Sequence, residues 1–137
     1  MNFVILLILL TNVVNLITGA EKFNHTKSIQ EIPGMVYIPE GEFTIGTNDG
    51  FAYEAPARKI YLPGFYIDRY EVTNIQYKRF IDATDYPAPK HWKNGNFPKG
   101  QENYPITNVS YYDALQFAKW SGKRLPTEEE WEKAARF

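Results

Sequence analysis

The chain has 137 residues, enough for at most one domain. Its 15 basic and 16 acidic residues are interspersed, which excludes the electrostatic attraction on which nucleic-acid binding depends. The sequence contains no cysteine, so a disulfide, a thiolate metal site and a cysteine nucleophile are excluded on this chain. Aromatic residues make up 16% of the sequence, which favours irregular loops packed around rings.

Residues 1–20 are distinct from the rest of the chain. Phe3–Leu10 is an unbroken apolar run, and small residues at 18–20 precede the charged pair Glu21-Lys22. This pattern predicts a signal peptide cleaved near Ala20, a secreted or periplasmic protein, and no membrane association after cleavage. The alternative is an uncleaved membrane anchor, although the apolar run is short for a span of roughly 20 residues.

Residues 21–33 are polar and predict a linker, so that the folded part is expected at 34–137. Asn24-His25-Thr26 and Asn108-Val109-Ser110 are glycosylation sequons, which matter only in a host that glycosylates secreted proteins. For the second sequon a chance tripeptide is the favoured interpretation, because Ser110 has a structural use described below.

Four short strands are predicted first, and turn residues separate them. The strands are Met35–Ile38, Glu42–Ile45, Lys59–Leu62 and Phe65–Asp68. Pro39-Glu40-Gly41 is the turn between the first two. Pro63-Gly64 suits a tight type II turn, so the last two are expected to form an antiparallel hairpin or to flank a wider loop.

Three helices are then predicted from capping boxes, in which a hydroxyl residue and an acid or amide three positions later bond each other's backbone amides. The pairs are Thr73 with Gln76, Ser110 with Asp113, and Thr127 with Glu130. Val72 with Tyr77 and Leu125 with Trp131 are expected to form hydrophobic staples. Gly122 stands where the second helix needs a C-terminal cap. No stop signal follows the third helix. A frayed terminal helix is one interpretation, and a chain cut short inside a larger domain is the other.

The loop from Tyr86 to Tyr104 contains the first candidate binding site. His91, Trp92, Asn94 and Phe97 form a possible ligand-stacking platform, and aromatic rings that pack the loop onto its own domain are the alternative. His25 and His91 lack the spacing of a metal pair and are interpreted as surface residues.

Other polar groups are weaker candidates. Asp68 and Glu71 could act as an acid and base pair, but a solvated turn with a contact to the helix dipole is the favoured alternative. Asn48-Asp49-Gly50 offers oxygen ligands of the kind that calcium prefers, although an ordinary turn is favoured there too.

A series of motifs in fixed order resembles the N-terminal part of the formylglycine-generating enzyme family, also called the sulfatase-modifying factor domain. The motifs are Gly34–Phe43, Gly46, Glu54-x-Pro56, Tyr70–Asn74, Pro105, Val109-Ser110, Asp113-Ala114 and Trp120–Glu132. The Gly-Lys-Arg-Leu-Pro-Thr-Glu stretch at 122–128 is the most specific of them. Tyr111 departs from the family, which usually has Trp at that position.

The resemblance implies an irregular α+β fold of the C-type-lectin-like kind, apparently truncated. For the family's enzymes it implies oxidation of a sulfatase cysteine to formylglycine by a copper-binding cysteine pair and molecular oxygen. That pair and the structural calcium ligands come after the Arg-Leu-Pro-Thr-Glu segment. No catalytic or metal residue, copper or calcium, is therefore assigned to this chain.

The matching residues are expected to be scaffold. They are Thr73, Asn74, Ser110, Gly122, Arg124, Thr127, Glu130 and Trp131. Arg124 is predicted to pair with Glu132 near Trp131, and Glu54 to cap a turn or pair with Arg58. Asn74 is predicted to bond turn backbone, and Gly122 to adopt a left-handed conformation.

Three functions follow as hypotheses. The first is an N-terminal, noncatalytic portion of a sulfatase-modifying-factor-like domain. The second is one piece of a formylglycine-generating oxidase whose remainder comes from a complementing chain. The third is an exported binding module for a peptide, glycan or protein. By analogy with the family's substrate groove, Trp92 to Phe97 is the predicted binding surface.

Overall fold

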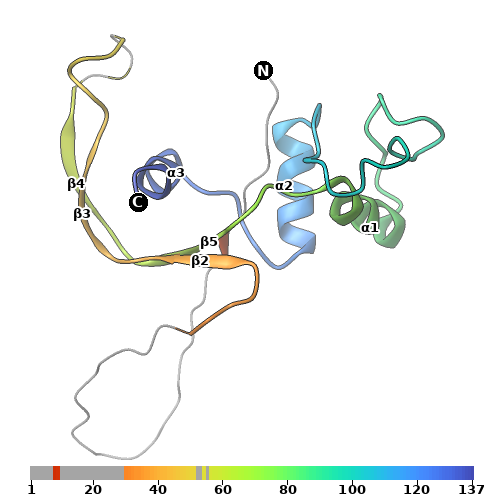
Figure 1. Ribbon diagram of the computed structural model, residues 1–137, viewed down its shortest axis with the longest axis horizontal. Coiled ribbons are helices and arrows are strands. Elements are labelled where there is room, and N and C mark those ends of the chain that lie inside the picture. Colours follow the sequence, from red (N-terminus) through yellow and green to blue (C-terminus); the bar gives the residue numbers. More distant parts are fainter. Residues whose placement is uncertain (1–7, 10–29, 52–53, 55) are drawn as a thin grey trace, which may run out of the picture.

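The computed structural model of the chain describes residues 8–9, 30–51, 54 and 56–137 (Figure 1). The predicted signal peptide and linker lie outside these residues, apart from the short strand β1 (Ile8–Leu9) and residues 30–33. The sequon at Asn24 and the nearby His25 also lie outside them. Among the helices that the structure describes, none has the length and apolar character needed to cross a membrane.

All four predicted strands are confirmed, as β2 (Met35–Ile38), β3 (Gly41–Ile45), β4 (Arg58–Leu62) and β5 (Phe65–Asp68). The expected pairing of the last two is wrong. β4 pairs with β3, and β5 lies between β2 and β1, with every pair antiparallel. Pro63-Gly64 therefore does not close a hairpin.

The pairing shows instead one long antiparallel ribbon that bends. Ile38 pairs with Phe65 and Gly41 pairs with Leu62, so residues 39–40 of one strand lie opposite residues 63–64 of the other. β2 and β3 thus continue one another, as do β4 and β5, and the bend falls at the gap between them (Figure 1). We call β2 to β5 the bent ribbon.

Gly64 has a packing reason to lie at this bend. A Cβ atom at position 64 would come within 2.2 Å of the Tyr37 hydroxyl. Tyr37 in turn packs against Tyr66 on the same face of the sheet, with ring centroids 5.0 Å apart. The absence of a side chain at Gly64 therefore makes room for the tyrosine pair.

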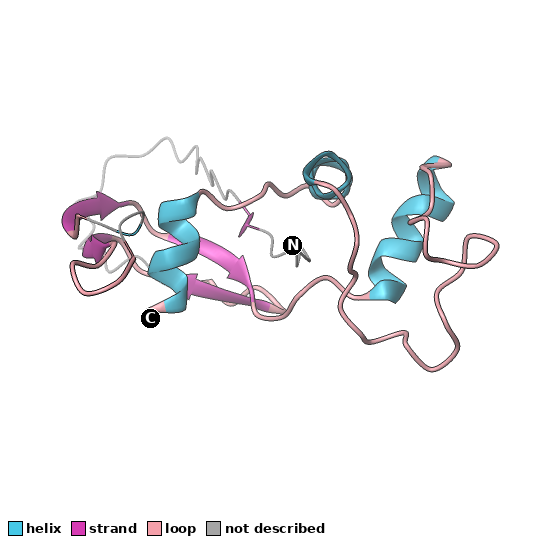
Figure 2. Cartoon of the chain, turned by 90° about the horizontal axis from the view of Figure 1, so that it is seen from above, coloured by secondary structure: helices cyan, strands magenta, loops and turns pink. Residues whose placement is uncertain are grey.

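The three predicted helices are confirmed, as α1 (Asn74–Thr84), α2 (Tyr111–Trp120) and α3 (Glu128–Ala135). Each begins with the expected capping box at Thr73, Ser110 or Thr127. Gly122 after α2 has φ of 70°, the left-handed conformation predicted for it. α2 runs across the direction of α1 and α3, since it is seen lengthwise in Figure 1 and end-on in Figure 2.

Two hydrophobic clusters hold these elements. The first, the α1–α2 core, joins α1 and α2 to the segments around them, and Tyr77 stacks on Phe117 at its centre with ring centroids 5.5 Å apart. The second, the ribbon core, contains Ile38, Phe65 and Ile67, with Ala134 of α3 packed against it. Helices and antiparallel strands thus both contribute, as an α+β class requires; the lectin-like arrangement stays a prediction.

The two expected staples differ in outcome. Val72 and Tyr77 are both buried in the α1–α2 core. Leu125 also packs against that core, whereas Trp131 exposes 55% of its surface. Leu125 therefore anchors the segment before α3 to the two other helices, and Trp131 contributes a ring to the molecular surface.

Candidate functional site

A pocket of about 630 Å³ opens where β5 ends and α1 begins. Four segments far apart in the sequence form its walls: the residues before β2, the β5–α1 connection, the loop before α2 and the residue after Gly122. The side chains that give the pocket its character are Asp68, Arg69, Tyr70, Glu71, Asn103 and Lys123.

One ion pair joins two of these segments. Lys123 Nζ lies 2.5 Å from Asp68 Oδ1, and both side chains are largely shielded from solvent. Burial raises the pKa of Asp68, and the hydrogen bond and charge of Lys123 offset only part of that increase. The pair connects the end of the bent ribbon to the end of α2.

The rim of the pocket carries polar side chains that make no hydrogen bond or ion pair within the described part of the chain. Arg69, Glu71 and Asn103 are exposed, and Tyr70 exposes 74% of its surface. Thr73 also lines the pocket, but its hydroxyl is engaged in the capping box of α1. The pocket therefore offers one aromatic ring, free charges of both signs and an amide to a ligand.

Asp68 and Glu71, the possible acid and base pair, both line this pocket. Asp68, however, is bound to Lys123, and Glu71 is exposed and has no side-chain partner among the described residues. The first turn of α1 contains no acidic residue, so neither carboxylate belongs to that turn. Sequence reasoning missed Lys123, although it is part of the Gly-Lys-Arg-Leu-Pro-Thr-Glu stretch.

Asn74 fixes the wall that carries Asn103. Its side-chain Nδ2 donates to the Gln101 carbonyl at 2.8 Å, and its backbone amide donates to the Tyr104 carbonyl at 2.9 Å. The prediction that Asn74 bonds turn backbone is confirmed. The start of α1 is thereby tied to the loop, and its first amides are satisfied.

The predicted binding loop lies apart from this pocket. Trp92 is buried in the α1–α2 core, and Phe97 packs against its ring with centroids 5.2 Å apart. These two rings attach the loop to its own domain, which was the alternative interpretation. His91 and Asn94 are exposed, and a binding role for the loop stays a prediction that rests on them.

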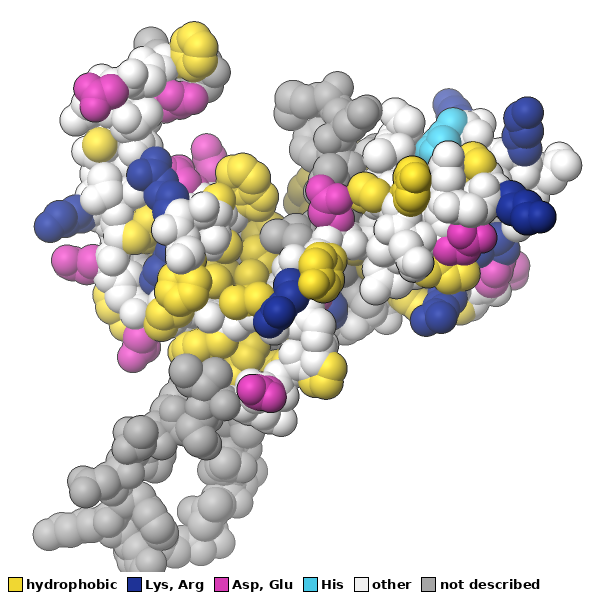
Figure 3. Space-filling view, in the orientation of Figure 1, with side chains coloured by type: hydrophobic (Ala, Val, Ile, Leu, Met, Phe, Trp, Pro, Cys, Tyr) yellow, Lys and Arg dark blue, Asp and Glu magenta, His cyan; other side chains and the backbone are white. Residues whose placement is uncertain are grey.

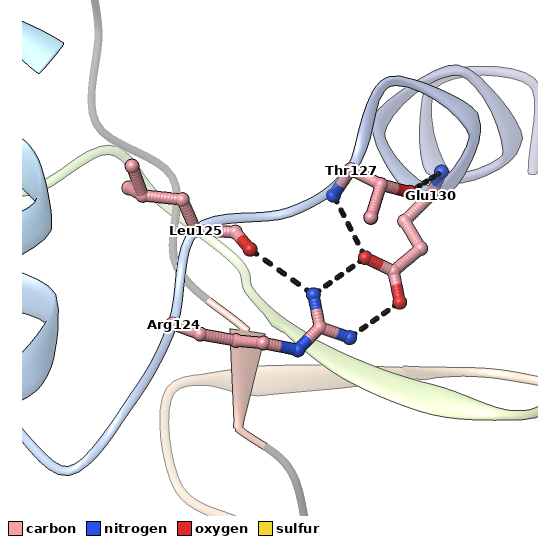
Figure 4. Close-up of polar contacts among 4 residues, drawn as sticks. All are labelled: Arg124, Leu125, Thr127 and Glu130. Carbon is pink, nitrogen blue, oxygen red and sulfur yellow. Dashed lines mark hydrogen bonds and ion pairs between the residues drawn. The ribbon is translucent and has the colours of Figure 1, made fainter.

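The most specific family stretch forms a compact set of polar contacts (Figure 4). Arg124 binds both carboxylate oxygens of Glu130, through Nη1 at 2.6 Å and Nη2 at 2.5 Å, and Nη1 also donates to the Leu125 carbonyl. The Thr127 amide donates to the same carboxylate at 2.8 Å. The predicted Arg124–Glu132 pair is wrong, because Glu130 at N3 of α3 faces back toward Arg124.

The charges in this set stabilise each other. Burial alone would raise the pKa of Glu130, but the hydrogen bonds from Arg124 and Thr127 together lower it. The hydrogen bond to Glu130 raises the pKa of Arg124. A bidentate pair of this kind fixes an orientation, here that of the segment between α2 and α3.

Glu132 has a different partner, in the bent ribbon. It accepts the Gly46 amide at 2.8 Å, and it also pairs with Arg136, whose Nη2 donates to the Gly46 carbonyl at 3.1 Å. Lys133 donates to the carbonyls of Pro39 and Gly41 at 2.8 and 3.1 Å. α3 is thus attached to both ends of β3 by charged side chains, and no local sequence signal predicts these contacts.

The hairpin end at 46–57 contains structural contacts only, among its described residues. Of the two predictions for Glu54, the turn cap is confirmed, because its Oε2 accepts the Phe51 amide at 3.0 Å, and the described residues show no pair between Glu54 and Arg58. Asn48 Oδ1 accepts the Ala57 amide at 2.9 Å, and the Thr47 hydroxyl accepts the Asp49 amide. In the described part of the chain, no group of three His, Cys, Asp or Glu is placed to hold a metal ion.

Known proteins resemble this chain over most of its length. It is 34% identical to the formylglycine-generating enzyme of Mus musculus and 36% identical to that of Thermomonospora curvata, over 74% and 80% of this chain. It is also 36% identical, over 74% of its length, to a Chlamydia trachomatis protein named serine/threonine-protein kinase Pkn1. The matches cover 39%, 51% and 19% of those three proteins, so the chain spans about half of their length or less.

The range matched by the family contains the contacts described above. The family described as sulfatase-modifying factor enzyme 1-like domain matches residues 20–137, which include the pocket, the Arg124–Glu130 pair and the contacts of α3 with the bent ribbon. The chain therefore belongs to the sulfatase-modifying factor enzyme 1-like domain family.

Proposed function

We propose that this chain is a scaffold portion of a formylglycine-generating type of domain and does not oxidise cysteine by itself. The observation that carries the proposal is the complete absence of cysteine from a sequence that matches the family over residues 20–137. A copper-binding cysteine pair, as the resemblance implies, would have to come from outside these residues.

The contacts of the family motifs support a scaffold role. Arg124, Thr127 and Glu130 bind one another, and Asn74 binds loop backbone. Each of these polar groups is used to orient a segment, so none is left free for a substrate. Their positions agree with a role in placing the ribbon and three helices relative to one another.

The test is an oxidation assay with the full chain. The chain is incubated with copper, oxygen and a cysteine-containing sulfatase peptide, and the aldehyde product is sought by mass spectrometry. The Thermomonospora curvata formylglycine-generating enzyme is the positive control. We expect product from the control and none from this chain; turnover by the chain alone would contradict the proposal.

A chimeric enzyme tests the scaffold role directly, because it can give a positive result. Residues 34–137 replace the matched part of the Thermomonospora curvata enzyme, and cooperative melting establishes that the chimera folds. Turnover by the chimera supports the scaffold role. A folded chimera without turnover would show that this portion is not equivalent to the enzyme's own.

The pocket beside α1 favours a second candidate, a noncatalytic binding module for a peptide or glycan. Tyr70 is exposed in its wall, and Glu71 and Asn103 line the same pocket without a side-chain bond to any described residue. An exposed ring next to polar groups suits an amphipathic ligand. If the pocket binds, Tyr70→Ala should weaken capture on a peptide or glycan array at least about tenfold, and equal capture would count against it.

A further inference from the structure

β5 has a strand on each side. β2 pairs with one edge, and β1 pairs with the other through Ile8 opposite Ile67 and Leu9 opposite Tyr66. β1 is the short red strand beside β5 in Figure 1. Phe65, Tyr66 and Ile67 are all buried, with exposed fractions of 5%, 8% and 4%.

A strand in this position needs partners on both edges. Successive backbone amides and carbonyls of an antiparallel strand point alternately to its two neighbours. β2 satisfies only one of these two rows. Without β1, the groups on the other edge of buried residues would lose their partner, and an unpaired buried group costs about 1–3 kcal/mol.

The segment that supplies β1 belongs to residues 1–20. The sequence predicts that this segment is removed by cleavage near Ala20. Removal would leave the outer edge of β5 open, and an open strand edge is a ready template for pairing with another extended segment. The bent ribbon would then expose an acceptor for a strand from elsewhere.

We propose that the β1-side edge of β5 is a strand-acceptor site for an extended apolar strand supplied from outside residues 21–137. Residues 8–9 occupy this site in cis as long as they are retained. After their removal, an apolar strand from a second chain takes their place by antiparallel pairing.

The register with β5 determines which residue types such a strand needs at each position. The position opposite Ile67 lies on the sheet face of the ribbon core, where Phe65 and Ile38 also lie. The position opposite Tyr66 lies on the other face, where Tyr37 packs. Apolar residues at both positions extend these two clusters, whereas a charge at either would lack a partner.

The length of the relatives agrees with an external strand. This chain spans 51% of the Thermomonospora curvata enzyme and 39% of the Mus musculus enzyme. Both therefore contain residues with no counterpart among the 137 of this sequence. The proposal goes beyond the scaffold function, because strand capture needs no oxidation chemistry.

Disulfide trapping in the full chain tests the cis pairing. The natural sequence has no cysteine, so two introduced cysteines can bond only with each other within the chain. Ile8→Cys with Ile67→Cys and Leu9→Cys with Tyr66→Cys place them at directly opposed positions. Because antiparallel pairs alternate between narrow and wide spacing, both pairs are made.

The control pair is Ile8→Cys with Tyr66→Cys, one residue out of register and on opposite faces. We expect at least one opposed pair to oxidise about tenfold faster than the control under mild oxidant. Equal rates in all three pairs would contradict the register. Cooperative melting of each variant shows that its ribbon has folded.

Capture in trans tests the acceptor. The full chain receives Ile8→Pro and Leu9→Pro, which remove the donor amides of β1, together with Tyr66→Cys. The probe is a synthetic peptide of residues 6–11 with terminal lysines and cysteine in place of Leu9. We expect a mixed disulfide at position 66, about tenfold more than with the natural residues at 8 and 9.

A matched peptide with its cysteine moved one position, to replace Ile8, is the register control. It should react more slowly, since its thiol lies on the opposite face of the sheet. No preference between the two peptides in a folded proline variant would overturn the proposal. The outcome is independent of the oxidation assay, so the failure of one hypothesis does not imply the failure of the other.

Discussion

Glu130, two residues after the most specific family stretch, is the centre of the polar contacts that this stretch makes. Its carboxylate accepts two bonds from Arg124 and one from the Thr127 amide, and its own amide donates to the Thr127 hydroxyl. The residue exposes only 9% of its surface. One acid thus caps α3 and also orients the segment that leads into it.

Glu130→Gln should lower the free energy of unfolding at pH 7 by about 2 kcal/mol, because the charge that pairs with Arg124 is lost and one of the two acceptor oxygens becomes an NH2 group. The folded-state pKa of Glu130 lies below its ordinary value of 4.5. Its stabilisation is therefore complete above pH 4.5 and is lost as the pH falls through the lowered pKa. Urea unfolding of both proteins between pH 7 and pH 3 measures this convergence.

The control is Glu128→Gln, which alters an exposed acid in the same first turn. It should change stability by at most about 0.5 kcal/mol. If the two variants lose equal stability at pH 7, the loss belongs to the helix dipole and not to the Arg124 pair.

Asp68 changes the free energy of unfolding in the opposite direction as the pH falls. Because burial raises its pKa in the folded state, protonation of Asp68 favours folding.

At the scale of elements, α3 packs against the bent ribbon with charged residues. Lys133 is 8% exposed, and its ammonium donates to the carbonyl of Pro39 within the bend and to that of Gly41 at the start of β3. Its stem also places the ammonium 5.8 Å from the centre of the Phe43 ring. The bend leaves two carbonyls to be satisfied, and a lysine is long enough to reach both.

Lys133→Met should destabilise the protein by about 2 kcal/mol, because methionine preserves the buried stem but leaves both carbonyls without their donor. Lys119→Met, in the last turn of α2 and exposed, is the matched control and should lie within about 0.5 kcal/mol of the natural chain. Chemical denaturation compares the two. A similar loss of stability in both variants would show that the bonds from Lys133 to the Pro39 and Gly41 carbonyls do not stabilise the protein.

At the scale of the whole molecule, the helices and strands could be predicted from the sequence, whereas the pairing of the strands could not. The capping boxes are recognised because their two residues lie three apart, and each helix begins where its box predicts. The ribbon register joins residues 35–45 to residues 58–68, and no local pattern encodes it. The Pro63-Gly64 turn signal was overridden because pairing over the whole ribbon outweighs one turn.

The candidate pocket illustrates the same limit. Asp68 and Glu71 could be suspected from their place after a strand, but Lys123 reaches Asp68 across 55 positions of sequence. Trp92 belongs to a loop whose aromatic residues suggested a ligand platform, but its ring lies in the core. The residue types in a loop do not reveal which way a ring points. Sites made by distant segments need the register and the helix positions before they can be located.

The bend of the ribbon also limits where related chains can differ in length. Adding one residue at 39–40 alone would shift β3 against β4 by one position and turn its side chains to the opposite face. A change at the hairpin end, between Ile45 and Arg58, leaves both ladders in register. Evolution can therefore lengthen the tip of this ribbon freely, whereas the bend can change only by matched insertions on both strands.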